Sequence, residues 1–250
     1  IGIILLIKAG DTLSEASATL AAFIGIPPIL VGLTVVSVAT SAPELFTSIS
    51  AITSNAKGLI LGNILGSNIA NIGLILGISL LIKPMDISGA VPVFQKNTLF
   101  LITLGFSSYL FFIPPHAITR EFGVILVFLL VSYLVFISYE AFRERKLKMS
   151  MPSAIEKKEG KGASQWQPIV LIVISSFGLW VGSETLVFGS KSFASQLGIP
   201  EELIGFSIVA VGTSLPELAA SIALLKKSQT AMLLGNIIGS NLFNIGLVGG

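Results

Sequence analysis

The 250-residue sequence contains few of the residues that enzyme sites and water-facing surfaces require. Cysteine is absent, which excludes disulfide bonds and thiolate metal sites. The single histidine, His116, follows Pro114-Pro115 in an expected loop and is interpreted as a surface residue. Charged residues make up only 11% of the chain, whereas soluble domains carry about 25%. The chain therefore has too few polar residues to cover a surface in water, and we expect an integral membrane protein.

Apolar residues are abundant instead: 53% of the chain is hydrophobic and the mean hydropathy is +0.91. Because a membrane-spanning helix needs about 20 apolar residues, the sequence predicts an all-α polytopic fold with eight spans. They cover about 1–24, 29–54, 57–82, 97–114, 119–142, 168–195, 202–225 and 229–250. The fourth and fifth are almost purely apolar and are expected to be scaffold. The second, third, seventh and eighth are interrupted by proline or by paired glycines.

The chain begins within a hydrophobic stretch, Ile1 to Leu6, that has no basic leader, so no cleavable signal peptide is predicted. Both ends are interpreted as cut. The second half of the sequence is therefore expected to be incomplete at its C-terminus.

One hydrophilic stretch, 143–167, separates the apolar regions. It contains seven lysines and arginines, and we interpret it as a solvated linker, with binding of anionic lipid as the alternative. Since basic loops stay cytoplasmic, the loop is predicted to lie inside and the N-terminus outside, which leaves only four of the fifteen basic residues outside. The expected domains are a first repeat at 1–142 with about five spans, the loop at 143–167, and a second repeat at 168–250 with about three.

A polar pattern within the apolar sequence occurs twice, at a constant separation of 173 residues. The first copy reads ATSAPE at 39–44 and GNILGSNIANIG at 62–73, and the second reads GTSLPE at 212–217 and GNIIGSNLFNIG at 235–246. This indicates an internal duplication. Because five spans is an odd number, the second copy enters the membrane from the opposite side. Inverted repeats with broken helices at matching positions are typical of secondary transporters that bind their substrate near the bilayer midplane.

Glu44 and Glu217 lie deep inside apolar spans, where an ionisable residue costs at least about 2.5–3.5 kcal/mol. A buried carboxyl without a role is the alternative, but the surrounding residues indicate a cation site, since hydroxyl and amide residues recur on the same helical faces. These stripes are Ser37, Ser41, Glu44, Ser48 with Asn63, Ser67, Asn71 in the first copy, and Ser207, Ser214, Glu217, Ser221 with Asn236, Ser240, Asn244 in the second. Brought together by a pseudo-twofold axis, they are predicted to line a small cavity with oxygen atoms.

Pro43 and Pro216 are predicted to interrupt the helices that carry the glutamates, because proline lacks an N–H group and clashes with the carbonyl four residues earlier. The carbonyls of Ala39 and Gly212 are expected to be freed, and those of Thr40 and Thr213 loosened, towards the cavity. Glycines four residues apart are expected to let neighbouring helices approach closely, namely Gly62, Gly66, Gly235 and Gly239.

Carboxylates, hydroxyls and carbonyls are hard oxygen ligands, which suit calcium and, with fewer ligands, sodium, whereas transition metals favour imidazole or sulfur. Two carboxylates balance one divalent or two monovalent ions. Sodium ions or protons are therefore expected to compete with calcium for the same charge, which is the physical basis of an exchanger.

At these motifs the chain resembles the calcium/cation antiporter superfamily, most closely its prokaryotic sodium/calcium exchanger type. The resemblance covers nearly the whole chain and implies a protein of a prokaryotic cell membrane with about ten spans, of which about two are missing here. It implies a calcium position between Glu44 and Glu217, with main-chain oxygen from Thr40 and Thr213. It further implies sodium or accessory positions at Ser37, Ser41, Ser67, Asn71, Ala210, Ser214, Ser240 and Asn244. The first and sixth helices are then expected to slide as a gate over a static core.

Three departures from the family pattern bear on the choice of ions. The first copy has Ala39 and Ala42 where Gly and Leu are commoner, and Ser37 stands opposite Ala210. Asn244 replaces an aspartate of several relatives, which argues against potassium co-transport. The Gly-Asn-x-x-Glu signature of the proton-coupled branch is absent, so sodium is preferred over protons as the counter-ion.

Asp11 and Glu184 match across the repeat in the expected gate helices. We interpret them as carboxylates that reach towards the extracellular surface, with attraction of cations at the outer mouth as the alternative.

Two other classes of protein were weighed. A cation channel also lines a cavity with carboxylates, but such rings usually surround an axis along the membrane normal. An intramembrane hydrolase lacks support, because neither a Gly-x-Ser-x-Gly nor a His-Glu-x-x-His motif is present. The expected partners are the lipid bilayer, calcium, and sodium or protons, without nucleic acid and without a cofactor; no oligomeric state is predicted.

Overall fold

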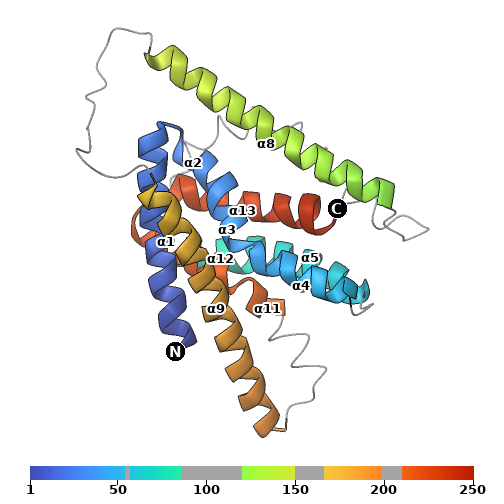
Figure 1. Ribbon diagram of the computed structural model, residues 1–250. Helices are drawn as coiled ribbons and strands as arrows, with labels where there is room; N and C mark the ends of the chain where they lie inside the picture. The colour runs from blue at the N-terminus through green and yellow to red at the C-terminus, as the bar shows by residue number, and fades with distance from the viewer. Residues whose placement is uncertain (54–56, 86–119, 150–165, 199–209) are drawn as a thin grey trace.

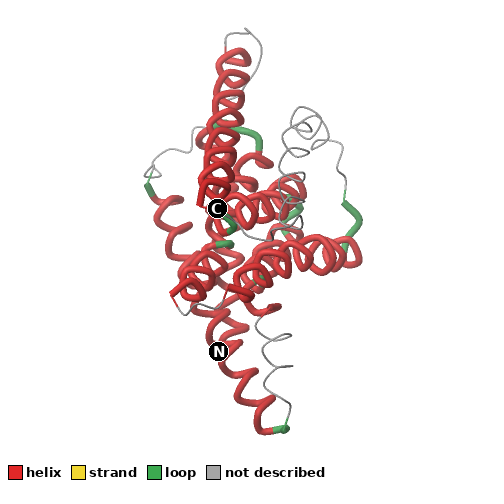
Figure 2. The backbone as a smooth tube through the Cα atoms, turned by 90° about the vertical axis from the view of Figure 1, so that its right-hand side faces the viewer, coloured by secondary structure: helices red, strands yellow, loops and turns green. Residues whose placement is uncertain are grey.

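The computed structural model describes residues 1–53, 57–85, 120–149, 166–198 and 210–250, and within these ranges every regular element is a helix (Figures 1 and 2). The first half contains α1 (Gly2–Ile24), α2 (Pro28–Val31), the π-helix η1 (Gly32–Val36), α3 (Ser37–Thr40), α4 (Ala42–Thr53), α5 (Lys57–Ile69), the π-helix η2 (Ala70–Leu76), α6 (Gly77–Ile82) and α8 (Arg120–Met149). The second half contains α9 (Gln167–Gln196), α11 (Ala210–Thr213), α12 (Leu215–Lys226), α13 (Thr230–Phe243) and the π-helix η4 (Asn244–Val248).

Most predicted spans coincide with helices or with runs of consecutive helices. Four described segments are long and apolar enough to cross a membrane, and a fifth is formed by the bent pair Pro28–Thr40 and Ala42–Thr53. The helix α1 falls outside this set because Lys8, Asp11 and Glu15 all lie within its 23 residues. The predicted span 97–114 and the first part of 202–225 lie outside the described residues.

The helix α8 is longer than the sequence predicted. It continues to Met149, six residues beyond the start of the expected linker at 143. Glu140 and Arg143 lie one turn apart on it and form an ion pair of 3.4 Å. Glutamate, arginine and lysine are good helix formers, so the helix extends past the end of the apolar run.

Helices α1 and α9 lie side by side, and the C-terminal end of α9 continues below the other helices in Figure 1. Their close approach depends on glycine. A Cβ atom on Gly2 would lie 2.8 Å from the carbonyl oxygen of Gly182, and one on Gly178 would lie 3.1 Å from the Cβ of Ala9. Small residues at such crossings allow van der Waals contact between backbones, on which helix association in membranes depends.

The helix α13 forms the centre of the molecule. Of an 18-residue apolar stretch in its span, 72% is buried inside the protein, against 28% for each of the other three long apolar spans. It packs against α2, η1 and α3, and a Cβ atom on Gly235 would overlap the carbonyl oxygen of Ile29, as one on Gly239 would overlap that of Leu33. The predicted role of these two glycines in close packing is confirmed. For Gly62 and Gly66, the segment equivalent to this partner lies outside the described residues.

Candidate functional site

Two helices break at equivalent points, and the breaks have the same backbone geometry. Between α3 and α4, Ser41 has φ −86° and ψ 5°, and between α11 and α12, Ser214 has φ −87° and ψ 5°. In the first repeat the axes on either side of the break differ by 43°. Each break brings the carbonyl end of one half-helix and the amide end of the next to the same place. Thr40 and Thr213 are the last residues of the half-helices that end there.

The two glutamates occupy the third position of α4 and α12. The proline before each lies in the first helical turn, where a missing N–H leaves no bond unmade. Both carboxylates are 1% exposed and lie at the positive end of a helix dipole, which favours negative charge. The C-terminal carbonyls of the preceding half-helices present partial negative charge at the same breaks. The arrangement combines two carboxylates with main-chain oxygens, as a cation requires.

Hydrogen bonds between the repeats occur in pairs related by the 173-residue offset. Thr40 Oγ1 donates to Asn236 Oδ1 at 3.2 Å, and the equivalent Thr213 Oγ1 donates to Asn63 Oδ1 at 3.4 Å. The amide groups make matching bonds within each repeat, since Asn63 Nδ2 donates to Ser48 Oγ at 3.0 Å and Asn236 Nδ2 donates to Ser221 Oγ at 3.4 Å. Reciprocal contacts of this kind are the mark of a twofold relation. The duplication in the sequence is thus a pseudo-twofold arrangement in space.

A second reciprocal pair lies one turn further along. Asn71 Nδ2 donates to Asn241 Oδ1 at 2.9 Å, and Asn244 Nδ2 donates to Asn68 Oδ1 at 3.1 Å. Asn244 begins η4, and Asn71 is the second residue of η2. Widened helical turns of this kind are rare and are frequently found at functional sites.

The carboxylates break this symmetry. Ser41 Oγ donates to Glu217 Oε1 at 3.0 Å, whereas the equivalent Ser214 Oγ has no hydrogen-bond partner among the described residues. This hydrogen bond nevertheless places the carboxylate of Glu217 beside Ser41, three residues before Glu44 in the first repeat.

Seven oxygen atoms in this region are buried and have no hydrogen-bond partner among the described residues. They are Glu44 Oε1 and Oε2, Glu217 Oε2, Ser67 Oγ, Ser214 Oγ, Asn71 Oδ1 and Asn244 Oδ1. An unsatisfied buried polar group costs about 1–3 kcal/mol, so such a concentration requires an explanation. Every one of these atoms can act as a ligand to a hard cation.

The structure brings the described residues of the predicted stripes together, and Ser207 lies outside the described residues. Two of the predicted oxygens are used differently. The hydroxyl of Ser37 donates to the carbonyl of Leu33 at 2.6 Å, within its own helical segment. The carbonyl of Gly212, predicted to be freed by Pro216, accepts a hydrogen bond of 2.6 Å from Ser183 Oγ. A hydroxyl from α9 thus lies against this break, a partner of the Gly212 carbonyl that the sequence did not predict. Ala210 is the first residue of α11.

Asn68, Asn241 and Ser183 also bond at the site but were not predicted as site residues. Asn68 and Asn241 stand in the repeated motif but one residue off the stripes of four-residue spacing, so the rule of a shared helical face did not select them. Their presence in both copies was the available signal. Ser183 has no such signal, since its equivalent in the first repeat is Gly10.

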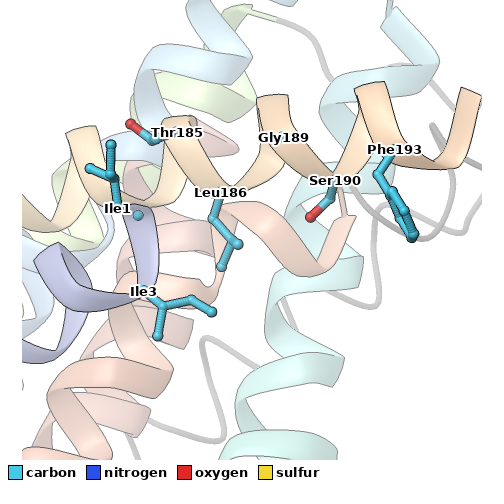
Figure 3. A pocket seen from close by; sticks show the side chains of 8 residues that line it. Ile1, Ile3, Thr185, Leu186, Gly189, Ser190 and Phe193 are labelled. Atoms are coloured by element: carbon cyan, nitrogen blue, oxygen red, sulfur yellow. The ribbon is translucent and has the colours of Figure 1, made fainter. Parts of the chain in front are cut away.

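The described residues contain no group of three or more histidine, cysteine, aspartate or glutamate side chains placed to hold a metal ion. An apolar hollow of about 320 Å³ lies elsewhere, where the start of α1 meets α9, with Ile3, Leu186 and Phe193 among its lining residues (Figure 3). The hollow includes none of the buried carboxylates or amides. The polar region at the two helix breaks is therefore the candidate site.

Asp11 lies near a residue predicted to be cytoplasmic. Lys227 Nζ donates to the main-chain oxygen of Asp11 at 2.8 Å and forms an ion pair of 2.9 Å with Glu15. Lys227 belongs to a loop that the charge pattern assigns to the inside. The contact is made to the main chain of Asp11, so the expected direction of its carboxylate stays a prediction. Glu184 is exposed on α9.

Comparison with known proteins agrees with this architecture. The sequence profile of the sodium/calcium exchanger protein family matches residues 1–139 and 167–250. The sodium/calcium exchanger MaX1 of Methanosarcina acetivorans is 32% identical over 99% of this chain and 79% of its own length, and the inner membrane protein YrbG of Escherichia coli is 34% identical over 99% and 76%. A structure of the sodium-calcium exchanger NCX_Mj soaked with Na⁺ and Ca²⁺ superposes with a TM-score of 0.81 at 34% identity, covering 98% of this chain and 76% of that one.

The family match extends over most of the chain, and the structural match covers both repeats. The matched relatives include sodium/calcium exchangers, which are transporters and not intramembrane hydrolases. The chain is an integral membrane protein with inverted repeats and belongs to the sodium/calcium exchanger family of cation antiporters.

Proposed function

We propose that this protein exchanges calcium for sodium across the membrane at the buried site between Glu44 and Glu217. The observation that carries the proposal is the group of seven buried oxygens without hydrogen-bond partners among the described residues. One bound cation is coordinated by several such oxygens at the same time. Hydrogen-bond donors would have to satisfy each oxygen separately. The matched relatives named as sodium/calcium exchangers support the identity of the ions.

The calcium position is assigned to the two carboxylates and to the main-chain oxygens of Thr40 and Thr213, where the half-helices end. Sodium or accessory positions are assigned to the surrounding hydroxyls, amides and carbonyls. These belong to Ser37, Ser41, Ser67, Asn71, Ala210, Ser214, Ser240 and Asn244. For Ser37, as for Ala210, the ligand is the main-chain oxygen, because the Ser37 hydroxyl donates within its own segment.

Charge balance explains why one site serves both ions. Two carboxylates neutralise one calcium ion, or two sodium ions or protons, so calcium and the monovalent ions exclude one another. Two buried carboxylates without a bound ion carry a large desolvation cost. This cost makes it unfavourable for the empty site to switch its access from one side of the membrane to the other. Protons are the alternative counter-ion and require the same carboxylates.

Access is proposed to alternate by movement of α1 and α9 relative to the helices that carry the site. These two helices lie together at one side of the molecule, and glycines line their contact. The proposal includes the repeats at 1–142 and 168–250 joined by a cytoplasmic loop at 143–167, the N-terminus outside, and a prokaryotic cell membrane as the location.

The test is calcium uptake into vesicles that contain the protein, driven in turn by an outward sodium gradient and an outward proton gradient. Glu44→Gln and Glu217→Gln keep the shape of the side chains and remove the charge, so uptake is expected to fall at least about 100-fold, which corresponds to a few kcal/mol of lost binding. Glu140→Gln changes a partly exposed carboxylate on α8 that lies outside the site; it is the matched control and is expected to retain uptake.

Uptake that follows only the proton gradient assigns protons as the counter-ion and keeps the site. If the protein is a cation channel, calcium is expected to enter without a sodium or proton gradient and without counter-flow of either ion. Unchanged uptake in both glutamine variants contradicts the proposed site.

A further inference from the structure

We propose that Asn68 and Asn241 are positioning residues that hold the amides of Asn244 and Asn71 across the repeats, so that the oxygen of each amide faces the cation site. The inference rests on the proposed function. Its basis is the reciprocal pair of hydrogen bonds between the four asparagines and the two buried amide oxygens that those bonds leave without a partner.

The side chain of an asparagine has two nearly isosteric ends with opposite chemistry. The oxygen accepts hydrogen bonds or ligates a cation, whereas the NH₂ group only donates. A rotation of 180° about χ2 exchanges the two ends at little steric cost, and the network of partners decides which end faces where. An amide beside a cation must therefore be held in one orientation.

Asn241 and Asn68 supply the restraint. Asn71 is 1% exposed, and its Nδ2 donates to Asn241 Oδ1 at 2.9 Å, which turns its own Oδ1 away from Asn241. Asn244 is fully buried, and its Nδ2 donates to Asn68 Oδ1 at 3.1 Å. In each case the amide oxygen that remains is buried and has no hydrogen-bond partner among the described residues. A flipped amide would lose the bond and present NH₂ to the cation.

The restraint crosses from one repeat to the other. The first bond joins η2 to α13, and the second joins η4 to α5. Although Asn68 is three residues from Asn71 in sequence, it holds Asn244, and Asn241 holds Asn71. The orientation of each ligand thus depends on how the other repeat is docked, and this crossed dependence distinguishes positioning from local stabilisation.

The experiment uses Asn68→Leu, which keeps the approximate volume and removes the acceptor, and Asn68→Asp, which keeps an acceptor at the same place. Each is combined with Asn244→Ala and, separately, with Asn71→Ala in the whole chain. The measurements are the calcium concentration for half-maximal uptake, the maximal rate, and the thermal midpoint with and without calcium. The set Asn241→Leu, Asn241→Asp, Asn71→Ala and Asn244→Ala repeats the design by symmetry.

We expect Asn68→Leu to raise the half-maximal calcium concentration about tenfold, a loss equivalent to one misplaced ligand, with a smaller effect on the maximal rate. Asn68→Asp is expected to bind calcium no more weakly than the unmodified protein. In a double-mutant cycle, Asn68→Leu should add nothing once Asn244→Ala is present, but should add its full effect to Asn71→Ala.

Three results would overturn the proposal: an unchanged half-maximal concentration in the leucine variants, equal impairment by leucine and aspartate, or additivity with Asn244→Ala. A lowered thermal midpoint without calcium, together with an unchanged calcium affinity, assigns the asparagines a structural role only and also overturns it. If the unmodified protein shows neither a calcium-dependent thermal shift nor uptake, the proposed function fails as well, which separates that outcome from failure of the positioning role alone.

Discussion

Several polar side chains around Glu44 and Glu217 bond to the opposite repeat, so single residues here help to hold the two halves together. Thr40 is fully buried, and its hydroxyl reaches Asn236 Oδ1 at 3.2 Å and Ser240 Oγ at 3.4 Å. Asn63 is bonded to three groups, since its Nδ2 reaches both the carbonyl of Glu44 and Ser48 Oγ at 3.0 Å while its Oδ1 accepts from Thr213. The geometry of the site is therefore coupled to the docking of the repeats.

Replacing Thr40 by valine tests this coupling. Thr40→Val keeps the shape but leaves Asn236 Oδ1 without its donor, so we expect the free energy of unfolding to fall by about 1–3 kcal/mol. The thermal midpoint in detergent without calcium or sodium measures the change.

The matched control is Thr53→Val, because Thr53 is exposed and its hydroxyl donates to the carbonyl of Ser50, one turn earlier in the same helix. It is expected to change the midpoint little, and Thr40→Ser should restore most of the loss. Equal effects at positions 40 and 53 would contradict the argument.

At the scale of helices, the two repeats differ in how their outer helices contact the core. A Cβ atom on Gly10 of α1 would lie 2.9 Å from the carbonyl oxygen of Ala219, so α1 lies against α12 with almost no side chain between them. The equivalents of Gly10 and Ala219 are Ser183 and Phe46. Phe46 instead contacts Trp180 of α9, with the ring centroids 6.1 Å apart. Bulky residues thus separate α9 from α4 where small ones bring α1 and α12 together.

Glycine at the centre of the bundle gives a sharper prediction. Gly235→Ala places a methyl group against the backbone of Ile29, and a backbone cannot rotate away as a side chain does. We expect a loss of about 1–3 kcal/mol or more in the free energy of unfolding, measured by thermal unfolding without ions.

Gly189→Ala on α9 serves as the comparison, since a Cβ atom there meets nothing within 4 Å. Alanine is preferred over glycine inside a helix by about 0.5–1 kcal/mol, so this variant should be unchanged or more stable. A destabilised Gly189→Ala variant alongside a stable Gly235→Ala variant would contradict the packing described for α13.

The ion pair that joins α1 to the end of α12 is expected to matter less. Lys227 and Glu15 have side chains 27% and 74% exposed, and pairs open to solvent contribute about 0–1 kcal/mol. Lys227→Gln should therefore shift the thermal midpoint less than Gly235→Ala does. The same measurement in high salt, which screens exposed charges, should reproduce the effect of the substitution.

For the whole molecule, the distribution of basic residues predicts the orientation in the membrane. Because the chain has no cysteine, single cysteines can be introduced without removing any. We expect Gln196→Cys to react with a membrane-impermeant maleimide in intact cells, and Lys226→Cys and Ser153→Cys to react only after permeabilisation. Gln196 and Lys226 are exposed at the ends of α9 and α12. The opposite labelling pattern would reverse the orientation assigned from charge.

The sequence was sufficient for the membrane class, the duplication and most span boundaries, and it pointed to two glutamates that the structure buries. These features are local or periodic: apolar runs of fixed length, a constant offset of 173 residues, and charged residues where the bilayer disfavours them. The family resemblance drawn from the same motifs was confirmed by the matched relatives. The extent of α8 was missed because helix propensity continues after hydrophobicity ends.

The partners of the polar atoms depended on packing. Thr40 with Asn236, and Asn71 with Asn241, are separated by 196 and 170 residues, so no local rule pairs them. The same holds for the hydroxyl of Ser183, which donates to the carbonyl of Gly212. It also holds for the π-helices that begin at Ala70 and at Asn244. Equivalent motifs acquire different contacts in the two repeats because the helices around them carry different side chains, as Ser183 and its equivalent Gly10 do. Only the docking of complete helices determines which atoms meet.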